Sequence, residues 1–204
     1  MNAYDLIRGF YGDRRAKRSG VPLINHIDEG LRILTHLCAS REAMDAFCIH
    51  PLLQHDNDLQ KGVWLLSEIP GPVVALAMEY RAVANACLSD CVGIYMGRPY
   101  WVDQQGPGLS VLADVNLMLI ADKVQNRADF LRHHGLTHPR AAELDFYFVG
   151  WLKALGVPVQ RYLELVDVMR GPTQPNPLEG GQLGRPLAEQ IARCQAAVEW
   201  KKDN

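Results

Sequence analysis

The chain has 204 residues, of which 48% are hydrophobic and 22% are charged, with a formal net charge of −2. This composition is typical of one globular domain, or of one domain with an appendage, and it disfavours a disordered chain. Because 21 basic residues stand against 23 acidic ones, the chain has no overall positive field for nucleic acid or an anionic membrane, so phosphate binding needs a local cluster. No stretch has the roughly 18 to 20 apolar residues of a membrane span, and the first residues lack the pattern of a secretory signal. We therefore expect a cytoplasmic protein with no membrane or nucleic-acid partner.

Apolar residues recur at helical spacing through the first half of the chain. We expect a first helix over residues 4–18, which ends at a Ser-Gly turn, and a second helix that enters at Pro22. Ser40 is a suitable N-cap for a third helix, from residue 41 to about Gln54. After a Pro-Gly-Pro sequence, an alanine- and leucine-rich run predicts one unbroken helix over residues 73–95.

The second half of the chain repeats the helical pattern after a glycine- and proline-rich loop, residues 97–108. Ser110 is expected to restart a helix that continues to about residue 134, and Pro139 and Pro158 are expected to open two more. Strand signals are nearly absent. The sequence therefore predicts an all-α domain over residues 1–170. A turn-rich linker and a short amphipathic tail helix follow, within residues 171–204.

Three polar side chains are embedded in apolar helical runs: His26, His50 and Asp122. An ionised aspartate buried in this way costs several kcal/mol unless it meets a cation, a metal or several hydrogen-bond donors. Two imidazoles and a carboxylate from different helices would form a site for Mn, Fe, Zn or Ni rather than for calcium. The alternative is structural: each histidine is a satisfied core residue, and Asp122 pairs with Lys123 or Arg127.

Two segments carry a resemblance to a known family. The sequence KRSGVPLINHIDEGLRIL, residues 17–34, resembles the opening of the HD hydrolase domain of RelA/SpoT-type alarmone enzymes. The sequence ADKVQNRADF, residues 121–130, is similar to a later segment of the same family. The resemblance implies an HD-domain helical bundle in which His26 is the first metal ligand, Asp122 is the last, and Asn126 contacts a nucleotide.

The resemblance also assigns a role to a basic pair. Lys17 and Arg18 stand where the family has residues that contact the substrate, and charged side chains of this kind form strong hydrogen bonds to phosphate. The alternative is that the pair is the solvated end of a basic run.

The middle segment, AFCIHPLLQHDND, departs from the family, in which the second histidine is followed at once by aspartate and a Glu-Asp pair comes a few residues later. If His50 is that histidine, Pro51 replaces the aspartate, and Gln54 and His55 replace the Glu-Asp pair. If His55 and Asp56 are the HD pair instead, the helix carries five extra residues. We favour the first alignment, because AFCIH continues the apolar pattern that leads into the pair. Pro51 should then kink the helix and swing His55 or Asp56 toward the site.

The expected metal centre therefore contains His26, His50 and Asp122, with help from His55 or Asp56. The resemblance implies manganese as the cofactor and removal of pyrophosphate from the ribose 3′ position of a guanosine polyphosphate. The catalytic positions would be Gln54 and His55. Since an amide cannot act as a base, His55 would take over, or the substrate would be a different nucleotide.

Two alternatives to a metal-dependent nucleotide phosphohydrolase remain. The first is a catalytically degenerate HD fold that binds a nucleotide without hydrolysing it. The second is a structural or partner-binding helical protein, for which the tail helix is the supporting feature. A homo-oligomer is compatible with each of these functions.

Overall fold

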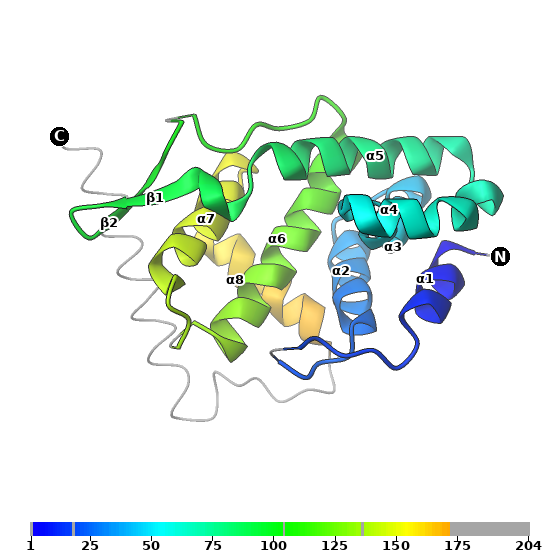
Figure 1. Ribbon diagram of the computed structural model, residues 1–204, viewed down its shortest axis with the longest axis horizontal. Helices are drawn as coiled ribbons and strands as arrows, with labels where there is room; N and C mark the ends of the chain where they lie inside the picture. Colours follow the sequence, from blue (N-terminus) through cyan, green and yellow to red (C-terminus); the bar gives the residue numbers. More distant parts are fainter. Residues whose placement is uncertain (1, 18, 104, 136, 172–204) are drawn as a thin grey trace.

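The computed structural model describes residues 2–17, 19–103, 105–135 and 137–171, except for the side chains of residues 61–64. Nearly all regular structure in this part of the chain is helical, which confirms the all-α class. In chain order, the elements are α1 (Ala3–Tyr11), α2 (Ile24–His36), α3 (Arg41–Gln54), α4 (Asp56–Gly62), the 3-10 helix η1 (Val63–Glu68), α5 (Gly71–Ala86), the 3-10 turn η2 (Ser89–Cys91), strands β1 (Val92–Tyr95) and β2 (Arg98–Trp101), α6 (Ala113–His133), α7 (Ala141–Ala154) and α8 (Val159–Arg170) (Figure 1).

Helix α6 lies at the centre of the fold and contacts α2, α3, α5, α7 and α8 (Figure 1). Apolar side chains such as Val115, Met118 and Leu119 bury one part of its surface. Its middle also buries charged and amide side chains, among them Asp122, Lys123 and Gln125. Polar groups in such a position need hydrogen-bond or ionic partners inside the protein, so α6 is the element on which a site is built.

Several predicted helix ends are confirmed. The third helix spans Arg41–Gln54 as expected, and the Ser40 hydroxyl accepts a hydrogen bond of 3.0 Å from the backbone N–H of Ala43. Pro158 directly precedes α8, which ends at Arg170. These ends were predictable because a cap and a proline act locally, within one turn of the helix.

The first helix is shorter than predicted. It ends at Tyr11 rather than near residue 18, because Gly12 adopts φ 52° and donates its backbone N–H to the carbonyl of Arg8. This left-handed conformation suits glycine and stops the helix. The described residues between α1 and α2, 12–17 and 19–23, lie in a loop in which Arg15 and Pro22 make an isolated β-bridge. Lys17 therefore lies on a loop and not at a helix end.

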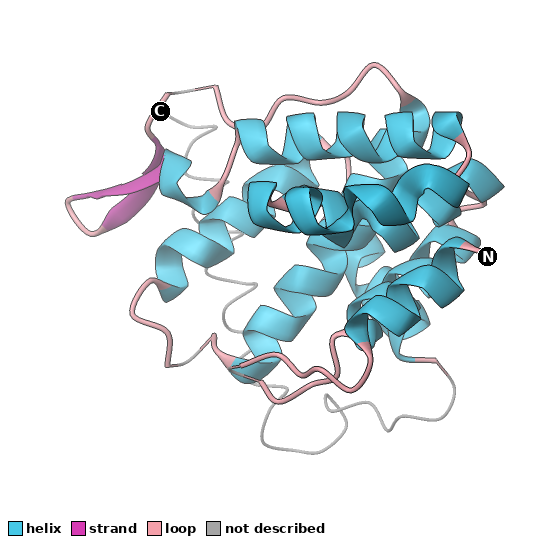
Figure 2. Ribbon diagram, turned by 45° about the vertical axis from the view of Figure 1, so that its right-hand side comes forward, coloured by secondary structure: helices cyan, strands magenta, loops and turns pink. Residues whose placement is uncertain are grey.

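The predicted helix over residues 73–95 is also wrong beyond residue 86. Helix α5 ends at Ala86, and β1 and β2 form an antiparallel hairpin in which Tyr95 pairs with Arg98. The two residues of its turn, Met96 and Gly97, both have positive φ, as a tight hairpin turn requires. Figure 2 shows the hairpin projecting from the helical body.

Two further differences concern the segments beside the site. Helix α4 begins at Asp56, directly after His55, so a further helix follows the predicted end of the third helix near Gln54. Helix α6 begins at Ala113, after Ser110, whose hydroxyl accepts a hydrogen bond from the backbone N–H of Leu112.

The predicted tail helix and nearly all of the predicted linker lie outside the described residues. Within the described part of the chain, no helix has the length and apolar character needed to cross a membrane.

Candidate metal centre

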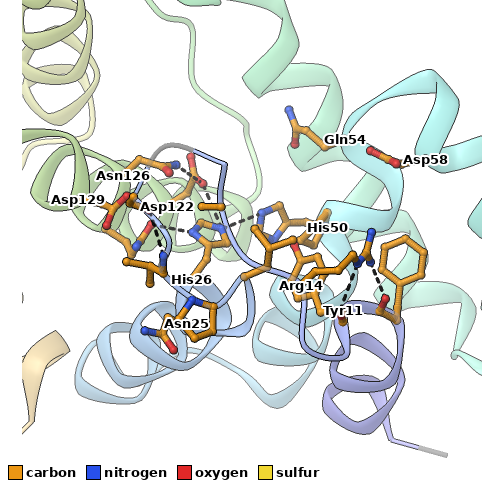
Figure 3. A pocket seen from close by; sticks show the side chains of 18 of the residues that line it. Tyr11, Arg14, Asn25, His26, His50, Gln54, Asp58, Asp122, Asn126 and Asp129 are labelled. Atoms are coloured by element: carbon orange, nitrogen blue, oxygen red, sulfur yellow. Dashed lines mark hydrogen bonds and ion pairs between the residues drawn. The ribbon is translucent and has the colours of Figure 1, made fainter. Parts of the chain in front are cut away.

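Three helices bring His26, His50 and Asp122 together (Figure 3). His26 comes from the first turn of α2, His50 from the last turns of α3, and Asp122 from the middle of α6. One ligand atom from each residue lies within 4.8 Å of the others. The Nε2 atoms of the two imidazoles are 3.2 Å apart, and the Nε2 atom of His26 is 3.6 Å from Oδ1 of Asp122.

The other ring nitrogen of each imidazole already has a partner. Nδ1 of His50 lies 2.6 Å from the backbone carbonyl oxygen of Phe47, which can only accept, so Nδ1 carries the proton. Nδ1 of His26 lies 2.7 Å from Oε1 of Gln125, whose amide nitrogen donates to Glu29 at 2.9 Å. That second contact orients the amide, so its oxygen accepts from His26.

When both imidazoles are neutral, their Nε2 atoms therefore present lone pairs toward the same point. Neutral imidazoles in these tautomers have no proton to share across the 3.2 Å between them. A cation between the two nitrogens and the carboxylate would satisfy all three groups. Metal-ligating histidines typically donate their second ring nitrogen to a carbonyl or carboxylate in this way.

Burial sets the protonation states of the two innermost ligands. It lowers the pKa of His50 to about 3, and the neighbouring His26 adds to this effect. Burial alone would raise the pKa of Asp122, but Lys123 and the two histidines outweigh it and lower the pKa to about 2. At neutral pH, His50 is thus neutral and Asp122 is ionised, which are the forms that bind metal.

Asp122 also has protein partners. Its Oδ2 lies 2.9 Å from Nζ of Lys123, and its Oδ1 accepts a 2.7 Å hydrogen bond from the Asn126 amide. The ion pair with Lys123 is one of the two pairings that the sequence left open, whereas Arg127 pairs with Asp145 instead. The carboxylate is therefore held without a metal, and Oδ1 is the oxygen that faces His26.

The three residues line a cavity of about 520 Å³. In Figure 3, Asp122, Asn126 and Asp129 lie on one side of it, and Arg14 and Tyr11 lie on the other. This volume falls within the roughly 300 to 1,000 Å³ typical of small-molecule sites.

The described residues that line the cavity include two cationic side chains, Arg14 and Lys123, and three carboxylates, Asp58, Asp122 and Asp129. With neutral histidines, its wall carries a net charge of −1, which a divalent ion would reverse to +1.

The remaining predicted residues of the middle segment separate into two groups. Gln54 and His55 line the cavity. The Gln54 amide donates to Asn85 at 2.6 Å, while its Oε1 is buried without a hydrogen-bond partner. Asp56 does not join the cluster: its side chain is 82% exposed and pairs with Arg81. The cluster thus contains His50 and not Asp56, and the expected help from Asp56 is absent.

The predicted basic pair is not part of the cavity wall as described. Lys17 is exposed on the loop of residues 12–23, and Arg18 lies outside the described residues. Arg14, on the same loop, lines the cavity; its guanidinium donates to the carbonyls of Phe10 and Tyr11 and lies 4.5 Å from the centre of the Phe10 ring.

Sequence reasoning missed Glu29 and Gln125, the residues that orient His26. A signal for both was present. Glu29 is three residues after His26, and Gln125 is three residues after Asp122, so each lies on the same helix face as a candidate ligand.

No family model, curated protein or solved structure matches this chain.

Proposed function

We propose that this chain is an HD-type helical protein that holds a divalent ion on His26, His50 and Asp122 and hydrolyses a phosphate ester or anhydride of a nucleotide. The observation that carries the proposal is the convergence of two imidazole lone pairs and a carboxylate oxygen at one point in a cavity. Three protein ligands leave coordination positions open, as in catalytic rather than structural metal sites. The nitrogen and oxygen donors suit Mn, Fe, Zn or Ni, and the sequence resemblance favours manganese.

A bound divalent ion would lower the pKa of a water molecule and polarise a phosphoryl oxygen. The residues of the chain would do the rest. His55 lines the cavity and can accept a proton, whereas the buried Oε1 of Gln54 can only accept a hydrogen bond. Arg14 would contribute positive charge on the opposite wall.

The charge of the cavity wall makes phosphate binding depend on the metal. Three carboxylates against two cations repel a polyphosphate, and a divalent ion changes the sign of this balance. The resemblance favours a purine nucleotide with a 3′-phosphate or 3′-pyrophosphate as the substrate. The resemblance assigns further phosphate contacts to Lys17 and Arg18.

The experiment is an assay of phosphate and pyrophosphate release from guanine and adenine nucleotides, with and without 3′-phosphates, by chelator-treated protein with added Mn²⁺. We expect turnover of a 3′-phosphorylated nucleotide that requires the metal and is lost in Asp122→Asn. Asp56→Ala is the matched control, because its carboxylate lies outside the cluster, and it should keep the activity. Metal-independent turnover, or equal loss in both variants, would contradict the proposal.

A nucleotide-binding protein without hydrolysis is the second candidate. The ion pair between Asp122 and Lys123 favours it, because the carboxylate is neutralised without a metal, and Gln54 stands where the family has an acid. In that case, the metal-loaded protein would bind the nucleotide in calorimetry and release no phosphate over hours.

A further inference from the structure

Pro51 occupies an unusual place, inside helix α3 and directly after the ligand His50. In an α-helix, the backbone N–H of residue 51 would donate to the carbonyl of residue 47. Proline has no N–H, and its ring also crowds that carbonyl. The helix nevertheless continues to Gln54, so the Phe47 carbonyl is left without its helical donor.

The His50 imidazole takes the place of the missing donor. Its Nδ1 lies 2.6 Å from the Phe47 carbonyl oxygen. Phe47 is fully buried and His50 is 4% exposed, so water cannot easily satisfy this carbonyl. The rings of Phe47 and Tyr80, with centroids 4.7 and 4.9 Å from that of His50, hold the imidazole in this orientation.

We propose that Pro51 is a positioning residue for the metal site: by leaving the Phe47 carbonyl open, it fixes His50 in the tautomer that directs the Nε2 lone pair at His26 and Asp122. The inference rests on the proposed metal site and concerns how this chain prepares one of its ligands. It also gives a role to the residue that replaces the aspartate in the resembling family.

His26 supplies an internal comparison, because a different device orients it. Its Nδ1 donates to Gln125, which Glu29 orients in turn, and no part of this chain of contacts involves Pro51. A change at Pro51 should therefore release the tautomer of His50 and leave that of His26 unchanged.

The test is Pro51→Ala, which restores a backbone N–H that competes for the Phe47 carbonyl. Nitrogen-15 NMR of metal-free protein at pH 8 reads which ring nitrogen carries the proton, with His50 assigned through the loss of its signals in His50→Gln. In wild type, we expect the proton on Nδ1 of both His26 and His50. In Pro51→Ala, we expect His50 to gain the Nε2-protonated form and Mn²⁺ affinity to fall about tenfold, the lower end of the usual effect of such supporting contacts.

The variant should unfold at a higher temperature than wild type, because alanine suits a helix interior better than proline. Weaker metal binding in a more stable protein separates positioning from a general structural role. The control is Pro158→Ala, at an exposed position before α8. It should change neither the tautomer of His50 nor the Mn²⁺ affinity.

Protonation of His50 on Nε2 in wild type, or an unchanged tautomer and Mn²⁺ affinity in Pro51→Ala, would overturn the inference. Failure of the proposed function has a different signature. In that case, wild type would bind no Mn²⁺, while the change of tautomer at His50 would still follow the substitution.

Discussion

At the scale of single residues, the proposed metal binding depends on Asp122 and the groups that compete for it. Its two oxygens face different partners, Lys123 on one side and Asn126 with His26 on the other. Lys123 is buried and lies over the Trp151 ring, 5.0 Å from its centre, so its ammonium cannot leave for solvent. The same carboxylate thus serves a structural ion pair and the candidate metal site.

Lys123→Met tests this competition. Removal of the cation leaves the buried Asp122 carboxylate without its ammonium partner, so the metal-free variant should lose about 3 kcal/mol or more of unfolding free energy. Mn²⁺ should then raise the melting temperature of the variant by more than it raises that of wild type, because the ion replaces the lost charge. Thermal unfolding with and without Mn²⁺ measures both effects. An equal or smaller shift in the variant would show that Asp122 does not hold the ion.

His50 predicts the acid response of the metal-free protein. Its folded-state pKa of about 3 lies below the ordinary value of 6.5, so the unfolded chain binds more protons between these two values. The contribution of neutral His50 to the free energy of unfolding is therefore complete above pH 6.5. It is lost as the pH falls below this value, at up to about 1.4 kcal/mol per pH unit. Asp122, whose pKa is lowered to about 2 from 3.8, adds a loss in the same direction below pH 3.8.

The measurement is urea unfolding of wild type and His50→Gln at several values between pH 7.5 and 4.5. The variant should show a clearly smaller decline over this range, because it lacks the group that titrates on unfolding. Parallel curves for the two proteins would contradict the assignment of a low pKa to His50.

At the scale of elements, the sequence predicted what local signals specify. The bounds of α3 follow from Ser40 and the apolar spacing, and three polar residues in apolar runs identified the members of the candidate site before any geometry was known. The left-handed Gly12 shortened α1, because a glycine permits such a φ without requiring it. The hairpin was missed because its strands are only four residues long, and they are stabilised by packing on α7 rather than by propensity. The spacing places Glu29 near His26 and Gln125 near Asp122, but the contact of Gln125 with His26 depends on the distance between α2 and α6, which periodicity does not give.

The contact between α2 and α3 positions both histidines, and Gly30 makes it possible. A Cβ atom at Gly30 would lie 2.1 Å from the buried Phe47 ring. Gly30→Ala should therefore cost about 1 to 3 kcal/mol of unfolding free energy through overpacking, and it should also weaken Mn²⁺ binding, since Phe47 carries the carbonyl that orients His50.

Gly9→Ala is the matched control, because no atom lies within 4 Å of the added Cβ and the position is inside α1. There alanine should raise stability by up to about 1 kcal/mol. Urea unfolding and Mn²⁺ calorimetry read both variants. The same response from both would mean that the Gly30 contact does not position the site.

At the scale of the whole molecule, the central point is that a chain with a net charge of −2 has no general attraction for phosphate. Phosphate binding therefore needs a local cluster of positive charge. The described cavity wall does not supply such a cluster without a divalent ion. The loop of residues 12–23 lies beside this cavity, with Arg14, Ala16 and Ser19 among the lining residues. The candidate metal centre and Arg14 therefore face the same cavity, where one ligand could contact both.

The basic loop has a separable contribution. Replacement of Lys17 and Arg18 by alanine should change stability by less than about 0.5 kcal/mol, as at ordinary surface positions. It should weaken binding of a 3′-phosphorylated nucleotide to the metal-loaded protein at least tenfold, because each charge-assisted contact contributes about 1.5 to 3 kcal/mol. Calorimetry at two salt concentrations measures the affinity for the nucleotide. We expect this affinity to depend less on salt in the double variant than in wild type. Unchanged binding would exclude this pair from the ligand site.

The existence of the metal centre is tested most directly by isothermal titration of Mn²⁺ into chelator-treated protein at pH 7.5. We predict one ion per chain for wild type and for Asp56→Ala, whose carboxylate pairs with Arg81 away from the cluster. We predict no measurable binding for His50→Ala. Absence of binding to wild type would contradict the metal centre, and loss of binding in Asp56→Ala with retention in His50→Ala would show that the ion is held by a different set of residues.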